Sequence, residues 1–163
     1  HIFEQHHYKG GHMGGGISYN LALMDGNKIV GGVVVGLPRH EKKYPDSVEL
    51  RRMACLEEMP KNTESYFLSK VLWYLKKNTN IKTVISYSDL SVGHKGTIYK
   101  AANFKEVGRT SPSLHVFWKG VRYHPRSLTI DRPYSYALRE AVKTGEAIIE
   151  KGEPKIIYAY KLA

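Results

Sequence analysis

Histidines are the first residues to consider for chemistry, because imidazole binds metal ions and transfers protons, and the chain has eight of them. His6, His7 and His12 lie close together in a glycine-rich segment. They lack the fixed spacing of a metal-binding helix or a zinc knuckle, and the one cysteine, Cys55, cannot supply a cysteine-rich zinc site. We therefore predict no zinc site, while iron held by histidine and carboxylate ligands remains a candidate cofactor.

Cys55 is also a weak candidate for a nucleophile. It falls within a predicted strand among apolar residues, where a thiol usually belongs to the packing. The chain contains no Walker phosphate loop, no dinucleotide-binding glycine pattern and no Gly-x-Ser-x-Gly motif. The sequence thus offers none of the familiar nucleophile or phosphate-binding patterns.

Basic residues gather in one part of the chain and point to a polyanionic partner. Lys and Arg number 25 against 15 Asp and Glu, which gives a formal net charge of +10, yet residues 1–60 are neutral. Residues 95–132 interleave basic and aromatic side chains, a combination that neutralises phosphates and stacks on unpaired bases. The alternative is a solvated surface whose aromatic residues belong to the core. The predicted nucleic-acid contacts are Lys95, Lys119, Arg122 and Arg126.

The apolar pattern predicts one α/β domain over residues 1–163, with a mixed sheet and with residues 1–16 as an irregular arm. Asp25-Gly26-Asn27 favours a hairpin turn, and Asn62 or Thr63 is expected to cap the first helix, of about 15 residues. The expected strands are 18–24, 28–37, 48–56, 82–88, 104–110, 113–118 and 155–162. The other expected helices are 94–103 and 134–144, and a basic loop is expected after residue 118.

The chain is not expected to enter a membrane. No apolar run approaches the roughly 18 residues that a membrane-spanning helix needs, and a single cysteine cannot form an intramolecular disulfide. These features favour a protein of the reducing cytoplasm. The sequence indicates no oligomeric state.

The most informative motif lies in residues 93–108. A predicted helix ending in Ile98-Tyr99-Lys-Ala-Ala-Asn-Phe104 precedes a strand with Val107-Gly108. This order resembles the GCN5-related N-acetyltransferase superfamily, in which Leu-Tyr-x-x-x-Gly-Phe is followed by Val-Gly. The resemblance implies an acetyltransferase-like α/β fold with a mixed, mostly antiparallel central sheet flanked by helices. It also places Tyr99 near the cofactor sulfur, where a tyrosine can protonate a departing thiolate; the alternative is an aromatic residue at the edge of the core.

The phosphate-binding loop of that superfamily is missing. Its Arg/Gln-x-x-Gly-x-Gly/Ala pattern should follow the strand ending near Leu56, but residues 57–65 contain no glycine. A helix N-terminus still offers free amides to a phosphate, although Glu57 and Glu58 oppose an anion. This departure argues against ordinary use of acetyl-CoA, while acyl-CoA (acetyl-CoA) or a related donor remains a candidate cofactor that the resemblance implies. Its candidate contacts are Arg52, Asn62 and Ser65.

Several further motifs narrow the resemblance. Together they resemble the family of the phage adenine-modification enzyme Mom, over residues 6–110, while residues 111–154 form a diverged basic region. The motifs are His7-Tyr8, Glu49-Leu-Arg-Arg52, Pro60-Lys-Asn-Thr-Glu-Ser65, Ser86-Tyr-Ser-Asp89 and Gly93-His-Lys-Gly-Thr-Ile-Tyr99. The resemblance implies transfer of a methylcarbamoyl-type group to the exocyclic amine of adenine in double-stranded phage DNA, which protects that DNA from host restriction. The implied catalytic positions are His7, Tyr8, Arg52, Ser65, Asp89 and Tyr99.

These positions have plausible chemical roles. Asp89, at the end of a central strand, could accept a proton from the adenine amine, and Tyr99 could act as the acid. Arg52 shares its predicted strand face with Leu50 and Ala54, so its burial would require an anionic partner. An Asp89–Arg52 ion pair that serves structure alone is the alternative for these two residues.

The remaining positions also have alternatives. Ser65 could bind a phosphate or an acyl oxygen, or could instead cap a helix. His7 and Tyr8 could contact the target base, or could belong to a disordered arm. Because the adenine amine is paired in a duplex, we expect base flipping, with Trp118 or Tyr123 as stacking groups.

Two other functions fit the sequence less well. One is an acyl-CoA-dependent N-acetyltransferase acting on a small amine or a protein lysine. The other is a non-catalytic nucleic-acid-binding module that has kept the acetyltransferase fold. Neither accounts for the localised basic residues and the candidate catalytic residues together.

Overall fold

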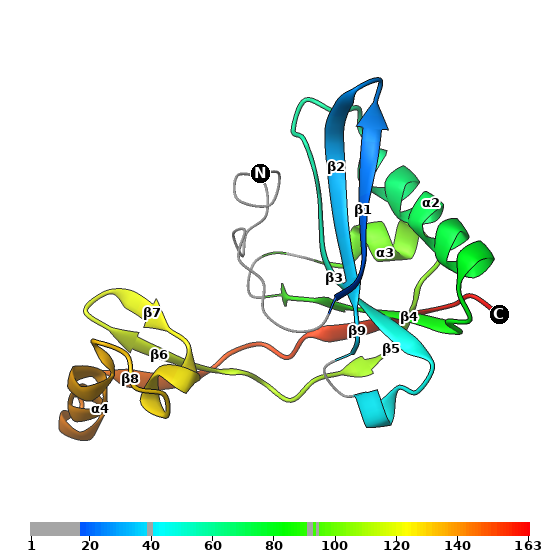
Figure 1. Ribbon diagram of the computed structural model, residues 1–163. Coiled ribbons are helices and arrows are strands. Elements are labelled where there is room, and N and C mark those ends of the chain that lie inside the picture. The colour runs from blue at the N-terminus through cyan, green and yellow to red at the C-terminus, as the bar shows by residue number, and fades with distance from the viewer. Residues whose placement is uncertain (1–16, 39–40, 91–92, 94) are drawn as a thin grey trace. The chain divides into compact units, whose positions relative to one another are not determined.

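A computed structural model of the chain describes residues 17–38, 41–90, 93 and 95–163 (Figure 1). Contacts divide the chain into two compact units. Unit 1 is His1–Ser88, Lys95–Gly108 and Ile156–Ala163, and unit 2 is Asp89–His94 and Arg109–Lys155. The expectation of a single domain over the whole chain stays a prediction. No helix among the described residues is long and apolar enough to cross a membrane.

Unit 1 is built on a six-stranded sheet with the strand order β1-β2-β3-β4-β9-β5. β3 and β4 are parallel, whereas the β1–β2, β2–β3 and β4–β9 pairs are antiparallel. The mixed, mostly antiparallel sheet predicted from the sequence is therefore confirmed. The helices and strands of unit 1 are β1 (Ile17–Asp25), β2 (Lys28–Gly36), the 3-10 helix η1 (Glu41–Lys43), β3 (Ser47–Cys55), α2 (Thr63–Asn78), β4 (Thr83–Ser88), α3 (Thr97–Ala101), β5 (Lys105–Arg109) and β9 (Ile156–Lys161).

The strongest sequence patterns match these elements. The hairpin between β1 and β2 turns at Gly26, whose φ of 57° suits a residue without a Cβ. The apolar stripe of α2 is buried, and Phe67 lies beside Gly31 of β2, so α2 packs on the sheet. The buried residues of this stripe are Phe67, Leu68, Val71, Leu72 and Leu75.

A bulge in β3 changes which residues share a face. Val34 pairs with Arg52, but the next residue of β2, Val35, pairs with Leu50, so Arg51 is an extra residue in the strand. The side chains of Val34 and Val35 point to opposite faces of the sheet because they are neighbours in β2, and the side chains of their partners in β3 do the same. The expectation that Leu50 and Arg52 share a face is therefore wrong.

β3 and β4 diverge after a short parallel pairing. Their paired residues run from Ser47–Thr83 to Glu49–Ile85, and both strands continue beyond this point without pairing to each other. We call the point where they separate the strand fork. Beyond it, no strand among the described residues pairs with the edge of β3 that faces away from β2.

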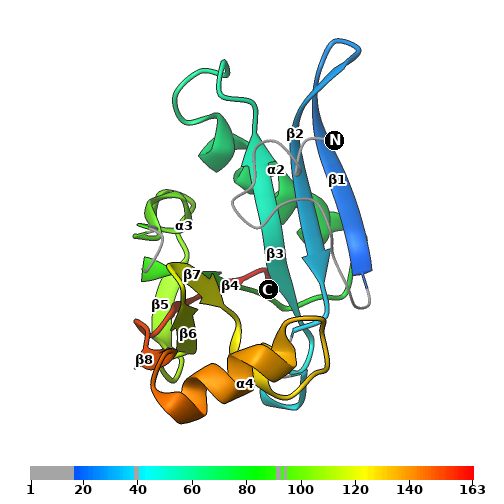
Figure 2. The same ribbon diagram turned by 90° about the vertical axis from the view of Figure 1, so that its left-hand side faces the viewer.

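Unit 2 is a three-stranded antiparallel sheet, of order β7-β6-β8, with a helix on one face. Figures 1 and 2 show α4 beside this sheet. The expectation of a basic loop after residue 118 is wrong, because a strand and a 3-10 helix form there. The elements are β6 (Leu114–Trp118), β7 (Val121–Tyr123), the 3-10 helix η3 (Pro125–Leu128), α4 (Ser135–Thr144) and β8 (Ile148–Lys151).

Unit 2 has its own small core and a tight hairpin. Val116 of β6 packs with Leu138 and Ala141 of α4 and with Ala147. The β6–β7 hairpin turns at Lys119 and Gly120, whose φ values of 50° and 73° are both positive, as a two-residue hairpin turn requires. Burial of Val116 and Leu138, both at 0% exposure, holds the sheet on the helix.

Candidate active site

The Tyr99 hydroxyl lies at the strand fork of unit 1. It forms a hydrogen bond with the side chain of Ser86, and Ser86 Oγ donates to the Leu50 carbonyl oxygen at 3.5 Å. Ser86 and Leu50 are the residues that directly follow the last β3–β4 pair. The predicted catalytic tyrosine is thus tied to the point where the two parallel strands separate.

The surroundings of Tyr99 keep its hydroxyl protonated. Burial raises the pKa of Tyr99 above its ordinary value, and the hydrogen bond to Ser86 opposes that rise. The negative charge of Glu64 and the neighbouring Tyr158 phenol raise the pKa further. A phenol that stays protonated at neutral pH can give up its proton to a strongly basic leaving group.

Aromatic packing and a glycine fix the position of Tyr99. Its ring centroid lies 5.6 Å from that of Phe104 and 5.3 Å from that of Tyr158. Gly96, with a φ of 71°, lies against the Tyr158 ring so closely that a Cβ would come within 2.5 Å of it. Because Gly96 adopts this left-handed conformation, α3 begins at Thr97 and is shorter than the expected helix 94–103.

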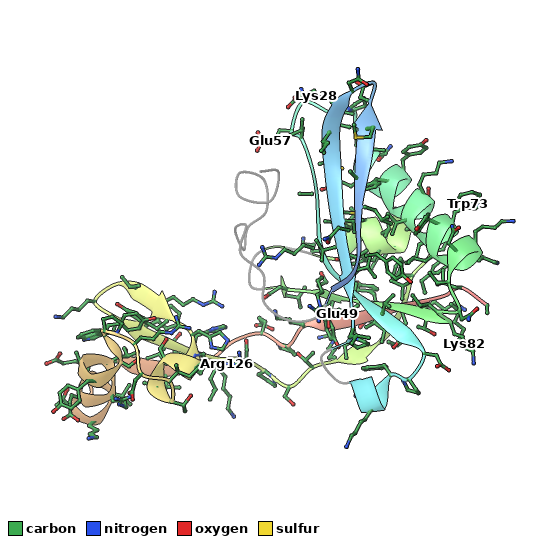
Figure 3. All side chains as sticks on the ribbon, in the orientation of Figure 1. Lys28, Glu49, Glu57, Trp73, Lys82 and Arg126 are labelled. Carbon is green, nitrogen blue, oxygen red and sulfur yellow. The ribbon has the colours of Figure 1, made fainter. Side chains whose placement is uncertain are left out.

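Asn62 and Ser65 line a cavity of about 420 Å³ that runs along α2. Ser65 Oγ donates to the Asn62 carbonyl oxygen at 2.9 Å. Asn62 occupies the N-cap position, one of the two residues expected there, but in a left-handed conformation and without a capping hydrogen bond from its side chain. Figure 3 shows Trp73, another lining residue, projecting from α2. The cavity is lined by Asn62, Ser65, Tyr66, Ser69, Leu72, Trp73, Lys76, Ala101, Ala102, Asn103, Tyr160 and Leu162.

These features fit an acyl donor with a nucleotide end only in part. Past the strand fork, the edge of β3 that no described strand covers can bind an extended chain as a strand would, and the cavity offers aromatic and polar side chains. The β3–α2 connection contains no glycine, and exposed Glu57 and Glu58 lie there (Figure 3 labels Glu57). Lys28 Nζ lies 2.9 Å from Glu58 Oε1, so one of these charges is compensated.

Arg52 and Glu49 share a face of β3. Arg52 pairs with Val34 and Glu49 with Gly36, which are two residues apart in β2. Arg52 is half-buried, and Glu49 is 4% exposed at the strand fork, where Figure 3 labels it. A buried carboxylate at this place is a functional candidate that sequence analysis missed, although Glu49 stood in the motif that contains Arg52.

Asp89 forms an ion pair in unit 2 that the sequence did not indicate. Lys155 Nζ lies 3.0 Å from Asp89 Oδ2, and the side chains are 24% and 12% exposed. Asp89 directly follows β4, and Lys155 directly precedes β9. Ser88, the last residue of β4, pairs with Ile156, the first residue of β9. The candidate catalytic carboxylate therefore lies beside an ammonium group in a largely buried ion pair.

His115 interacts with Arg122 and is electrically neutral. Arg122 Nε donates to His115 Nδ1 at 3.2 Å, and Arg122 Nη2 lies 3.0 Å from His115 Nε2. A guanidinium can only donate, so the imidazole must keep a lone pair. Burial lowers the pKa of His115, and the charges of Arg122 and Lys155 lower it further, against the opposing effect of Asp89 and Glu150. His115, Arg122 and Asp89 thus belong to one electrostatic group.

The predicted nucleic-acid contacts fall into both units. Lys119, Arg122 and Arg126 belong to unit 2, and Lys95 is an exposed residue of unit 1. Figure 3 shows Arg126 on unit 2. Trp118 and Tyr123, the expected stacking groups, pack against the Val116 cluster, so the alternative that these aromatic residues belong to the core holds for both.

His7 and Tyr8 lie outside the described residues, as do His6 and His12. Within the part of the chain that the structure describes, no three His, Cys, Asp or Glu side chains gather as a metal ion would require. The predicted roles of His7 and Tyr8 and the iron hypothesis stay predictions.

A model of the Mom protein family matches residues 1–157. The chain belongs to the Mom protein family. The Mom match continues through the basic segment of unit 2, beyond the residues 6–110 that carried the resemblance in the sequence. No curated protein sequence matches.

Solved structures similar to this Mom-family chain include acetyltransferases. The ribosomal-protein-S18-alanine N-acetyltransferase from Escherichia coli has 12% identity and a TM-score of 0.59, over 99% of this chain and 84% of that one. A Bacillus subtilis acetyltransferase in complex with CoA has 13% identity and a TM-score of 0.55, over 88% and 76%. An N-acetyltransferase from Staphylococcus aureus Mu50 has 13% identity and a TM-score of 0.53, over 88% and 67%. The predicted acetyltransferase-like fold is confirmed.

Proposed function

We propose that this protein transfers a methylcarbamoyl-type group to the exocyclic amine of adenine in DNA and so protects that DNA from restriction. The observation that carries the transfer chemistry is the protonated Tyr99 hydroxyl held on Ser86 at the strand fork. Membership of the Mom family supports an acyl-transfer-like function, and adenine is the acceptor that the sequence resemblance implies. The donor is a relative of acyl-CoA whose carbonyl carbon carries the methylamino group on one side and the CoA sulfur on the other; when bound it supplies the activated carbonyl group.

Each proton in the reaction has a candidate group. The new bond joins the amine nitrogen to the carbonyl carbon, and the carbon–sulfur bond breaks. Tyr99 gives its proton to the leaving sulfur, which leaves as a thiol. Asp89 accepts the proton that the amine loses, and its ion pair with Lys155 holds the carboxylate in position for this transfer. The amine of adenine is a poor nucleophile, so removal of this proton must assist the attack.

The remaining predicted residues bind rather than react. Asn62 and Ser65 hold the nucleotide end of the donor in the cavity beside α2. Arg52, on the face of β3 that also carries Glu49, holds an anionic group of the donor. Basic residues of unit 2, with Lys119 and Arg126 exposed, bind the phosphates of double-stranded DNA.

Restriction digestion tests this proposal. Plasmid DNA from cells that express the protein is treated with enzymes whose sites contain adenine, because a group on the adenine amine blocks their contacts in the major groove. We expect resistance with the wild-type protein and full cleavage with Asp89→Ala, provided that both proteins are folded and abundant. Full cleavage in both cases, together with acetylation of a small amine or a protein lysine by acetyl-CoA, would establish the N-acetyltransferase alternative instead.

A further inference from the structure

The two faces of the sheet in unit 2 carry different residues. Val116, Trp118 and Tyr123 pack with α4 in the small core. Side chains alternate along a strand, so Phe117 lies on the other face of β6. The residues on this other face, which we call the outer face, are His115 and Phe117 of β6, Arg122 of β7, and Ile148 and Glu150 of β8.

Phe117 stands at the centre of the outer face. Its partner in β7 is Arg122 and its partner in β8 is Ile148, so an aromatic ring has a guanidinium on one side and an aliphatic side chain on the other. Phe117 is half-buried and Arg122 is exposed, while Ile148 is 57% exposed. Glu150, the acidic residue of this face, pairs with His115 and not with Phe117, so it is not the cross-strand neighbour of Phe117.

Arg122 is held in place by neighbouring residues. His115 accepts from its Nε at 3.2 Å, and Ser113 Oγ lies 3.2 Å from His115 Nε2 on the same imidazole. The ring of His115 packs against Gly152, where a Cβ would come within 2.3 Å of Nε2. His115 is therefore a positioning residue that orients Arg122 beside Phe117.

We propose that the outer face binds an unpaired adenine of the DNA acceptor, with Phe117 stacking on the base and Arg122 contacting a neighbouring phosphate. This inference rests on the proposed function. A sheet surface with an exposed aromatic residue beside a fixed cation is the usual platform for unpaired bases, since every base has a stacking face and every linkage carries a phosphate.

The position of Asp89 supports the same assignment. The charge of Asp89 acts on His115, so the candidate proton acceptor belongs to the same group of side chains in unit 2. An adenine amine inside a duplex is paired and cannot react, so the enzyme must take the base out of the stack. A stacking residue in the same unit as the proton acceptor meets that need, whereas Trp118 and Tyr123 are occupied in the core.

Fluorescence anisotropy with two labelled duplexes tests the proposal. One duplex contains a single bulged adenine, and the other is the same sequence fully paired. We expect the wild-type protein to bind the bulged duplex more tightly, and Phe117→Leu to lose that preference by about tenfold while its affinity for the paired duplex stays unchanged. Leucine keeps the apolar side chain and removes the ring. Phe117→Tyr, which keeps a ring, should keep the preference.

The matched control is Tyr136→Leu, which removes a 71% exposed aromatic residue from α4 instead of from the sheet. It should keep the wild-type preference. The proposal that Phe117 stacks on the adenine would be overturned if wild type and Phe117→Leu preferred the bulged duplex equally, or if the wild type showed no preference for it. These outcomes are separate from the proposed function. Resistance to restriction in cells that express Phe117→Leu would support the function and contradict the proposed role of the outer face.

Discussion

Lys155 Nζ lies 3.0 Å from Asp89 Oδ2, and this ion pair is formed where the β4–β9 ladder ends. Asp89 comes directly after β4 and Lys155 directly before β9, so the backbone pairing of Ser88 with Ile156 brings the two charges together. Both side chains are largely buried, which makes the pair costly to break. The arrangement gives the candidate proton acceptor a fixed position at the start of unit 2.

Replacing Lys155 tests the importance of this pair. Lys155→Met leaves the Asp89 carboxylate mostly out of water without this cation, and we expect it to lower the free energy of unfolding by roughly 1–3 kcal/mol. Chemical denaturation measures the change. The control is Lys82→Met, since Lys82 Nζ and Asp46 Oδ2, 3.2 Å apart, form a pair with side chains 67% and 60% exposed. That substitution should cost less than about 1 kcal/mol. Equal losses would show that the Asp89 pair has no special role.

Tyr99→Phe should remove the acid and keep the fold. The ring contacts with Phe104 and Tyr158 remain, so the thermal midpoint should change little, while the rate of group transfer should fall about a hundredfold or more. The fraction of modified deoxyadenosine in cellular DNA measures the activity. Tyr19→Phe, a change in β1 where the ring contacts Tyr74, is the control and should retain full activity. Wild-type modification by Tyr99→Phe would exclude Tyr99 as the proton donor.

Cys55 should be chemically inert at neutral pH. Burial, with a smaller effect of Glu64, raises the pKa of Cys55 to about 11, so almost none of the thiol is ionised. We expect alkylation by iodoacetamide to be slow at neutral pH and to accelerate steadily as the pH rises toward that value. Cys55→Ser should retain activity within about twofold. Fast labelling of the folded protein at neutral pH would contradict this account.

Acidification should destabilise unit 2 through His115. The pKa of His115 in the folded protein lies below the ordinary 6.5, so the unfolded chain takes up a proton at a higher pH than the folded one. The stabilisation is therefore complete above the ordinary value and is lost as the pH falls through the folded pKa. The thermal midpoint should fall more between about pH 7.5 and about pH 5.5 in the wild type than in His115→Gln. Parallel pH profiles would contradict the neutral state of His115.

The elements that sequence analysis predicted well are those with long, regular patterns. The stripe of α2 from Phe67 to Leu75 recurs over several turns, and the turn at Gly26 needs a residue that tolerates positive φ. Such signals depend on neighbouring residues alone. The motif around Tyr99 likewise predicted the acetyltransferase fold, which the solved structures confirm.

The missed features depend on contacts between distant segments. Nothing in the sequence marks Arg51 as the extra residue of a bulge, because the register of β3 is set by its pairing with β2. β8 was missed because Ile148 and Ile149 are both exposed and the strand lacks a buried alternation. The partnership of Asp89 with Lys155 follows from the β4–β9 ladder, which brings together residues far apart in the chain.

Mass spectrometry of nucleosides tests the central claim most directly. DNA is isolated from cells that express the protein, and from cells that express Asp89→Ala at the same level, and is digested to nucleosides. The account predicts a heavier deoxyadenosine with the wild-type protein alone, and the added mass identifies the transferred group. Deoxyadenosine of ordinary mass in both samples, with folded and abundant protein, would contradict it.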